Sequence, residues 1–206
     1  MSLRIVLATG NPGKLREMRA LLGGTGIEVL PQTELGVRTV AETGGTFLEN
    51  ALLKARNAAR QTGLPALADD SGLEVNALHG APGVHSARYA GAHGNDQANV
   101  DKLLRALQGV PGAQRSARFC CALVLVRHAD DPAPLVSEAT WEGSILEARR
   151  GANGFGYDPV FLAAGAQRSA AELPSAEKNR LSHRGQALRA LVAQLRERVA
   201  ELALPC

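Results

Sequence analysis

The chain is poor in cysteine and in long apolar runs, and each scarcity excludes a class of protein. Its three cysteines, Cys120, Cys121 and Cys206, form neither a disulfide framework nor a zinc motif with Cys/His spacing. No apolar run reaches the roughly 18 residues of a membrane span, and the start at 1–5 has no signal-peptide core. We therefore expect a soluble, cytoplasmic protein in a reducing compartment.

Charge of one sign is not in excess either. The 23 basic and 20 acidic residues leave a formal charge of +3, which is too balanced for a protein that binds nucleic acid or a membrane surface. We expect neither partner. Aromatic residues make up only 3% of the chain, and arginine far outnumbers lysine. Against that bias, each retained lysine indicates a local need for an ammonium group. The lysines are Lys14, Lys54, Lys102 and Lys178.

The 45% of apolar residues is ample for a core, and strand and helix patterns alternate along the chain. We expect strands at 3–8, 28–30, 117–127, 135–147 and 159–162, with short extended pieces on both sides of Asp69 and Asp70. We expect helices at 12–22, 47–62, 95–107 and 182–202, a hairpin turn at 130–132 and a long loop at 76–94. This order predicts a single α/β domain, 1–206, with a mixed sheet and flanking helices.

Asp69 and Asp70 follow the apolar stretch at 64–68, where a short buried strand is expected to end. Strand ends in α/β proteins open onto ligand sites, and two adjacent acids repel each other unless a cation offsets them. Because side chains alternate along an extended segment, one acid can face a site while the other turns to structure. On this segment alone, an Asp-rich turn is the alternative.

The segment TGNPGK at 9–14 joins the first strand to the first helix. Asn11 suits the N-cap and Pro12 the first helical position. The free N–H groups of the helix start and its dipole favour an anion, the two glycines allow close approach of a ligand, and Lys14 adds positive charge. The spacing is not that of a Walker A loop. The segment is either a phosphate-binding turn or an ordinary capped turn.

Two glutamates flank the start of the second helix. Thr46 and Glu49 form a capping box, which accounts for Glu49, whereas Glu42 lies in the preceding loop. With Asp69 and Asp70 they form an acidic set, and carboxylate oxygens suit Mg²⁺ when substrate phosphates are present. The alternative for Glu42 is a solvated loop residue.

Two of the scarce aromatic residues fall in the glycine-rich loop 154–158. Phe155 lies between two glycines, and Tyr157 follows the second. An aromatic ring in such a loop can lie flat on a planar ligand, or both rings can pack into the core.

Cations cluster where the last helix is expected to begin. Ser182 as N-cap would place His183 and Arg184 in the first turn, where positive charge is unfavourable unless it faces an anion or a keto oxygen. A polar surface histidine is the alternative. His79, His85 and His93 have no metal-site spacing and stay unassigned.

Together, the phosphate turn, the carboxylates, the stacking loop and the basic donors indicate a nucleoside triphosphate site.

Six ordered blocks resemble the Ham1-like nucleoside triphosphate pyrophosphatases, the inosine/xanthosine triphosphate pyrophosphatase family. They are TGNPGK at 9–14, ETGGTFLENALLKA at 42–55, ADDSGLEV at 68–75, APGVHSARYAG at 81–91, GFGYDPVF at 154–161 and AEKNRLSHRGQAL at 176–188. The resemblance implies an elongated mixed sheet with flanking helices, two lobes around a central substrate cleft, and a homodimer. It implies Mg²⁺-dependent hydrolysis of ITP, dITP and XTP to monophosphate and pyrophosphate, which would cleanse the nucleotide pool.

Carried over by position, the resemblance assigns roles within these blocks. Asp70 would be the catalytic residue that orients or deprotonates the attacking water, and Glu42 and Asp70 would hold Mg²⁺. Phe155 would stack on the purine, while the cations near the last helix would read its keto edge. The residues expected to bind substrate are Thr9, Gly10, Asn11, Pro12, Gly13, Lys14, Lys54, Ser71, Phe155, Gly156, Tyr157, Asp158, Lys178, His183 and Arg184.

Two other functions fit these residues. One is the same hydrolysis with a different base preference, such as modified pyrimidines. The other is a nucleotide-sensing or nucleic-acid-binding module without turnover, which would need a concentrated basic face and could dispense with Asp70.

Overall fold

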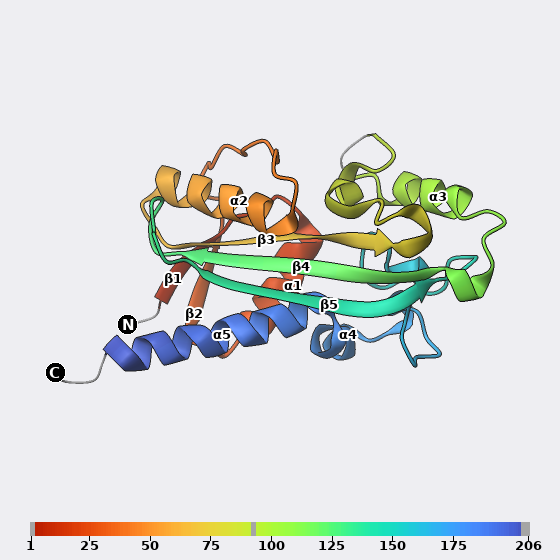
Figure 1. Ribbon diagram of the computed structural model, residues 1–206. Coiled ribbons are helices and arrows are strands. Elements are labelled where there is room, and N and C mark those ends of the chain that lie inside the picture. Colours follow the sequence, from red (N-terminus) through yellow and green to blue (C-terminus); the bar gives the residue numbers. More distant parts are fainter. Residues whose placement is uncertain (1–2, 92–93, 203–206) are drawn as a thin grey trace. The chain divides into compact units, whose positions relative to one another are not determined.

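The computed structural model, shown in Figure 1, describes residues 3–91 and 94–202. The strands are β1 (Leu3–Leu7), β2 (Ile27–Pro31), β3 (Ala66–Val75), β4 (Ser116–Val126), β5 (Leu135–Ile145) and β6 (Phe161–Ala163). The α-helices are α1 (Pro12–Leu22), α2 (Phe47–Thr62), α3 (Asp96–Ala106), α4 (Ser175–Leu181) and α5 (His183–Leu202). The strand order is β2-β1-β3-β4-β5-β6, with β1 parallel to β2 and β3, and β5 antiparallel to β6. The predicted α/β class with a mixed sheet is confirmed.

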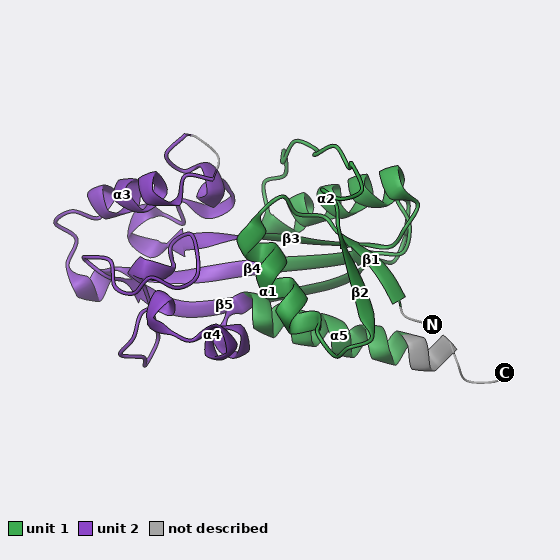
Figure 2. Ribbon diagram, turned by 180° about the vertical axis from the view of Figure 1, so that it is seen from behind, with its two compact units in different colours: residues 1–70, 122–139, 184–206 green, residues 71–121, 140–183 purple. Residues whose placement is uncertain are grey.

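The chain divides into two compact units, which are coloured separately in Figure 2. Unit 1 comprises Met1–Asp70, Ala122–Ala139 and Arg184–Cys206, and unit 2 comprises Ser71–Cys121 and Thr140–His183. The strands β3, β4 and β5 therefore each contribute residues to both units. One boundary falls directly after the acid pair, and another separates His183 from Arg184.

In unit 1, helix α2 has an alanine stripe that packs on the sheet. The buried stripe includes Ala51, Ala55, Ala58 and Ala59, in one cluster with residues of β1, β3 and β4. Small residues at this helical spacing let the helix backbone approach the strands closely. The predicted ends of α2 are confirmed, since the capping box forms at its start and Gly63 ends it in the left-handed conformation.

In unit 2, the core is built around three aromatic rings. Phe119 lies 4.6 Å from Phe161 and 6.4 Å from Trp141, measured between ring centroids. Helix α3 adds Val100 and Leu103 to the same cluster. This core supports the loop 154–158.

In four places the structure differs from the predicted elements by more than one or two residues at an end. β3 runs unbroken for ten residues through the acid pair instead of ending at it. The predicted loop 76–94 contains two 3₁₀ helices, Asn76–Leu78 and Gly83–Arg88. The predicted strand at 159–162 begins as a 3₁₀ turn at Asp158–Val160, since Pro159 cannot donate to a sheet ladder. A short helix, α4, precedes α5 and was not expected.

Within the described ranges, 3–91 and 94–202, no helix has the length and apolar character needed to cross a membrane. Within the same ranges, Cys120 and Cys121 do not take part in a disulfide. His93 and Cys206 lie outside the described residues.

Candidate active site

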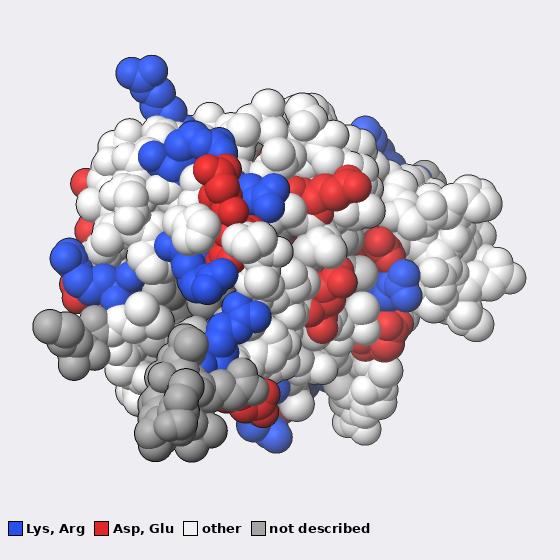
Figure 3. All heavy atoms as spheres, turned by 60° about the vertical axis from the view of Figure 1, so that its left-hand side comes forward, with Lys and Arg blue, Asp and Glu red and all other residues white. Residues whose placement is uncertain are grey.

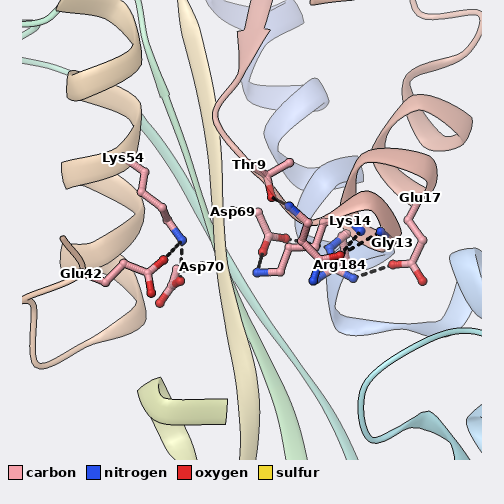
Figure 4. A network of polar contacts seen from close by, with 10 residues as sticks. Thr9, Gly13, Lys14, Glu17, Glu42, Lys54, Asp69, Asp70 and Arg184 are labelled. Carbon is pink, nitrogen blue, oxygen red and sulfur yellow. Dashed lines mark hydrogen bonds and ion pairs between the residues drawn. The ribbon is translucent and has the colours of Figure 1, made fainter. Parts of the chain in front are cut away.

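Asp69 and Asp70 lie in the middle of β3, and their side chains point to opposite sides of the strand (Figure 4). Both residues are buried, with 0% and 6% of their surface exposed. The predicted alternation is confirmed, and it gives each acid a different cation. Asp70 contacts Lys54, whereas Asp69 contacts Lys14 and Arg184.

On the Asp70 side, one ammonium joins two carboxylates. Lys54 of α2 donates from Nζ to Asp70 Oδ1 at 2.5 Å and to Glu42 Oε1 at 2.8 Å. Burial raises the pKa of Asp70, although the charge of Lys54 opposes that rise. Burial also disfavours the charge on Lys54, but Asp70 and Glu42 outweigh it and raise the pKa of Lys54. Lys54 therefore stays an ammonium at neutral pH.

The loop that contains Glu42 is anchored on the same helix, one turn before Lys54. The buried Asn50 accepts a hydrogen bond from Gly44 N at 2.8 Å and donates to Gly44 O at 3.3 Å. A Cβ on Gly44 would lie 2.6 Å from Glu49 Cβ, so the loop needs glycine at this close approach. Because α2 supports both groups, Glu42 and Lys54 hold a defined relative position.

The donor set at Lys54 fits a magnesium ion that is shared with substrate. Mg²⁺ takes oxygen ligands and is usually held by one or two carboxylates plus substrate phosphates. Glu42 and Asp70 already converge on a single cationic group. Across the described part of the chain, no group of three or more His, Cys, Asp or Glu residues could hold a metal by itself. Phosphate oxygens and water would have to complete the shell.

On the Asp69 side, the carboxylate binds two cations. Lys14 Nζ donates to Asp69 Oδ1 at 2.5 Å, and Arg184 Nε donates to Oδ2 at 2.7 Å. Burial would raise the pKa of Asp69, but the charges of Arg184 and Lys14 hold it well below its usual range. Arg184 is itself 2% exposed and also donates to Glu17 Oε2 at 2.5 Å. Its role in base reading stays a prediction, while its ion pairs assign it a second task, the neutralisation of Asp69.

The start of α1 is capped by its own residues. Asn11 Oδ1 accepts from Gly13 N at 2.8 Å and from Lys14 N at 3.1 Å, and Thr9 Oγ1 accepts from Asn11 N at 3.1 Å. The expectation that these N–H groups are free for an anion is therefore wrong. Attraction for phosphate at this turn depends on the helix dipole and the Lys14 ammonium. Gly10 is exposed, and a Cβ there would meet open space.

In unit 2, the loop 154–158 separates its two aromatic residues. Tyr157 is buried in the core, and its hydroxyl donates to Ser86 O at 2.8 Å. Phe155 is half-buried, so its ring keeps some exposure. Of the two alternatives for this loop, core packing holds for Tyr157, while stacking on a ligand stays a prediction for Phe155.

The same loop is held by a buried ion pair. Lys178 of α4 donates to Asp158 Oδ2 at 2.5 Å, and the same oxygen accepts from Phe155 N at 2.9 Å. The Lys178 ammonium lies 5.0 Å from the centroid of the Phe155 ring. Gly154 has φ +78°, and any Cβ there would overlap the Asp158 carboxylate. Lys178, Asp158 and Phe155 thus form one connected group, and their contact with substrate stays a prediction.

His183 and Ser71 complete the predicted set. His183 begins α5, is 5% exposed, and stacks on Phe119 at 4.8 Å between ring centroids. Ser71 follows Asp70 in β3 and is half-buried. Sequence reasoning missed Glu17, Asn50 and Asp96, whose contacts are with predicted site residues or their loops. A polar Asn50 inside the alanine stripe of α2 was the one readable signal among them.

Comparisons with known proteins identify the family of this chain. The sequence profile described as Ham1 family matches residues 5–194. The chain is 59% identical to a dITP/XTP pyrophosphatase of Vibrio parahaemolyticus, over 96% of this chain and 99% of that one. It is 58% identical to a dITP/XTP pyrophosphatase of Thioalkalivibrio sulfidiphilus, over 95% and 100%. A solved HAM1 protein from Coxiella burnetii aligns with a TM-score of 0.86 at 53% identity, over 95% and 99%. The chain belongs to the Ham1 family.

Proposed function

We propose that this chain hydrolyses deaminated purine nucleoside triphosphates, namely ITP, dITP and XTP, to the monophosphate and pyrophosphate, and so cleanses the nucleotide pool. One observation carries the proposal: Lys54 joins Asp70 and Glu42 in a chain whose full-length relatives are named dITP/XTP pyrophosphatases. Two carboxylates that converge on one ammonium group suit a substrate that brings both phosphate and a divalent cation.

In unit 1, the proposed tasks follow from the charges. Lys14 and Lys54 offset negative charge on the triphosphate and on the leaving pyrophosphate. Asp70 accepts a hydrogen bond from the water that attacks the α-phosphorus and thereby orients it. Glu42 and Asp70 would hold Mg²⁺, which would act as a Lewis acid on the phosphate oxygens.

In unit 2, the proposed tasks concern the base. Phe155 stacks on the purine, and Lys178 and His183 donate to its keto edge. Arg184, which follows His183 in the chain, has the same proposed task. A 6-keto purine offers an acceptor to these donors, whereas adenine offers an amino group that leaves them unpaired. An unpaired buried donor costs about 1–3 kcal/mol, which is enough for strong discrimination when two or three are involved.

A substrate panel tests the proposal. Pyrophosphate release would be measured with Mg²⁺ for ITP, dITP, XTP, the common triphosphates and modified pyrimidine triphosphates. We expect the deaminated purines to give the highest kcat/KM. A preference for modified pyrimidine triphosphates would change the proposed substrate class but leave the proposed hydrolysis to monophosphate and pyrophosphate in place. No release from any triphosphate would overturn the proposal.

The binding-module alternative lacks support from the charge distribution. On the face shown in Figure 3, basic and acidic side chains are interspersed and do not form a broad basic surface. The formal charge of only +3 also argues against a concentrated basic face. A homodimer and a cytoplasmic location stay predictions, and light scattering on the purified protein tests the first.

A further inference from the structure

Asp96, the first residue of α3, contacts the loop that contains Phe155. Its Oδ2 accepts a hydrogen bond from Gly156 N at 2.7 Å, across 60 positions of sequence. The side chain is half-buried. It is not needed as the helix cap, because the Asn95 side chain already accepts from Ala98 N at 3.0 Å. Neither the resemblance nor the proposed mechanism gives Asp96 a task.

The contact matters because of where it falls in the loop. The Phe155 N–H donates a hydrogen bond to Asp158 Oδ2, and the next N–H in the chain, that of Gly156, donates to Asp96 Oδ2. Two carboxylates therefore hold the two successive N–H groups around the Phe155 ring. Gly154 and Gly156 both have positive φ, +78° and +61°. Glycine can adopt many other backbone conformations, so without these hydrogen bonds the loop would not be restricted to this one.

Helix α3 gives this hold a rigid support. Val100 and Leu103 of α3 lie in the same buried cluster as Tyr157 and Val160, which follow the loop residue Gly156. Asp96 therefore connects the loop to a packed helix. A group held in its binding conformation before the ligand arrives loses less entropy on binding.

We propose that Asp96 is a positioning residue of the base site, which holds the 154–158 backbone so that Phe155 presents its ring to the purine. This inference rests on the proposed function for the identity of the ligand. The hold is a hydrogen bond to a carboxylate oxygen, so an uncharged acceptor of the same shape should preserve it. The effect should appear in binding of the base and be absent from the handling of pyrophosphate.

The test compares Asp96→Ala and Asp96→Asn with the control Asp101→Ala. Asp101 is on the same helix, but its carboxylate is exposed and pairs with Arg149. Asp96→Ala should weaken inhibition by inosine monophosphate by about tenfold or more. Inhibition by pyrophosphate and kcat at saturating ITP should stay close to wild type. Asp96→Asn should restore most of the lost affinity, and Asp101→Ala should change nothing.

Amide hydrogen exchange of segment 151–158 provides a readout that needs no turnover. Without ligand, exchange there should be faster in Asp96→Ala and near wild type in Asp96→Asn. Unchanged exchange and unchanged affinity in Asp96→Ala would overturn the inference, and so would equal losses in both variants, which would make the charge responsible. If wild type released no pyrophosphate from any triphosphate, the proposed function would fail while the exchange experiment still decided the role of Asp96 in the loop.

Discussion

At the scale of single residues, Asp69 and Asp70 are adjacent in the chain but bind different cations. Asp69 is fully buried between Lys14 and Arg184, whereas Asp70 shares Lys54 with Glu42. Removing the charge of Asp69 should therefore have a different consequence from removing the charge of Asp70. Loss at Asp69 takes one carboxylate from Lys14 and leaves Arg184 with Glu17, and loss at Asp70 leaves Lys54 with the carboxylate of Glu42.

The first prediction is that Asp70→Asn nearly abolishes turnover while the fold survives, because it removes a catalytic charge without changing shape. The loss should correspond to several kcal/mol of activation free energy. Pyrophosphate release gives the rate, and thermal unfolding gives the stability. Asp69→Asn is the matched comparison, and it should instead lower stability by about 3–5 kcal/mol, since it breaks buried ion pairs. Activity of Asp70→Asn within about threefold of wild type would contradict the assignment.

The second prediction separates stacking from base reading. Phe155→Ala should weaken all purine triphosphates alike, by roughly 1–3 kcal/mol, because stacking does not discriminate among purines. Arg184→Ala should lower kcat/KM for ITP and XTP more than for ATP, if the arginine reads the keto edge. It should also lower the melting temperature, because the buried Asp69 would lose its hydrogen bond from Arg184. An equal loss for ITP and ATP in Arg184→Ala would leave this arginine with its structural task alone.

The sequence pointed to the candidate site residues, whose roles stay predictions, but it did not indicate their partners in the structure. Short blocks identified Lys14, Asp70 and Arg184 as site residues, because the chemistry of each is local to its own motif. The contact between Arg184 and Glu17 spans 167 positions, and no local pattern indicates which carboxylate a distant arginine meets. The contact of Asp96 with Gly156, 60 positions away, could not be predicted for the same reason.

At the scale of elements, local signals predicted the helix ends and missed the strand continuity. The capping box of α2, its glycine stop and the Asn11 cap of α1 formed as expected, because each is decided within a few residues. The run of β3 through two buried acids was not expected, since a strand tolerates them only when tertiary cations are present. Helix α4 was hidden because seven residues are too few to show a helical period.

The third prediction concerns the turn between β4 and β5. The buried Asp131 accepts from Arg127 N and Nε at 2.9 Å and from Ala133 N at 3.0 Å. The hydrogen bonds from Arg127 lower the pKa of Asp131, although burial opposes them. A folded-state pKa below the unfolded one stabilises the fold above the unfolded value of about 3.9, and this contribution disappears as the pH falls below it.

Asp131→Asn should therefore lower the melting temperature by several degrees at neutral pH, and the difference from wild type should shrink as the pH falls below about 4. Asp130→Asn is the control, because the Asp130 side chain is 86% exposed and pairs with Arg60, which is itself exposed. It should melt close to wild type throughout. A gap for Asp131→Asn that stayed constant down to acidic pH would show that the turn needs the shape of the residue rather than its charge.

At the scale of the whole molecule, each of the four lysines has a specific polar partner, as their scarcity in the sequence led us to expect. Lys14, Lys54 and Lys178 each pair with a buried aspartate, and Lys102 donates to Tyr89 O at 2.6 Å. Each lysine therefore has the local requirement that its rarity indicated. Because the lysines at the proposed site are already neutralised by carboxylates, they alone do not offset the charge of a triphosphate. A divalent cation that arrives with the substrate would supply the missing positive charge.

The fourth prediction is that activity requires a divalent cation and rises from neutral to alkaline pH, as the attacking water loses its proton more readily. Excess EDTA should abolish pyrophosphate release, and added Mg²⁺ should restore it. Glu42→Gln should raise the Mg²⁺ concentration needed for half-maximal rate, while thermal unfolding of the variant should stay near wild type. Full activity in excess EDTA would remove the metal from the mechanism.

The fifth prediction identifies the phosphorus that is attacked. If water attacks the α-phosphorus, hydrolysis of ITP in heavy-oxygen water should place the label in inosine monophosphate and none in pyrophosphate. Attack at the β-phosphorus would give the same two products with the label in pyrophosphate, and attack at the γ-phosphorus would release orthophosphate. Mass spectrometry of the products separates the three cases. Label in the monophosphate supports a water oriented by Asp70 at the base-proximal phosphate, and either other pattern would require the triphosphate to bind in a different register along Lys14 and Lys54.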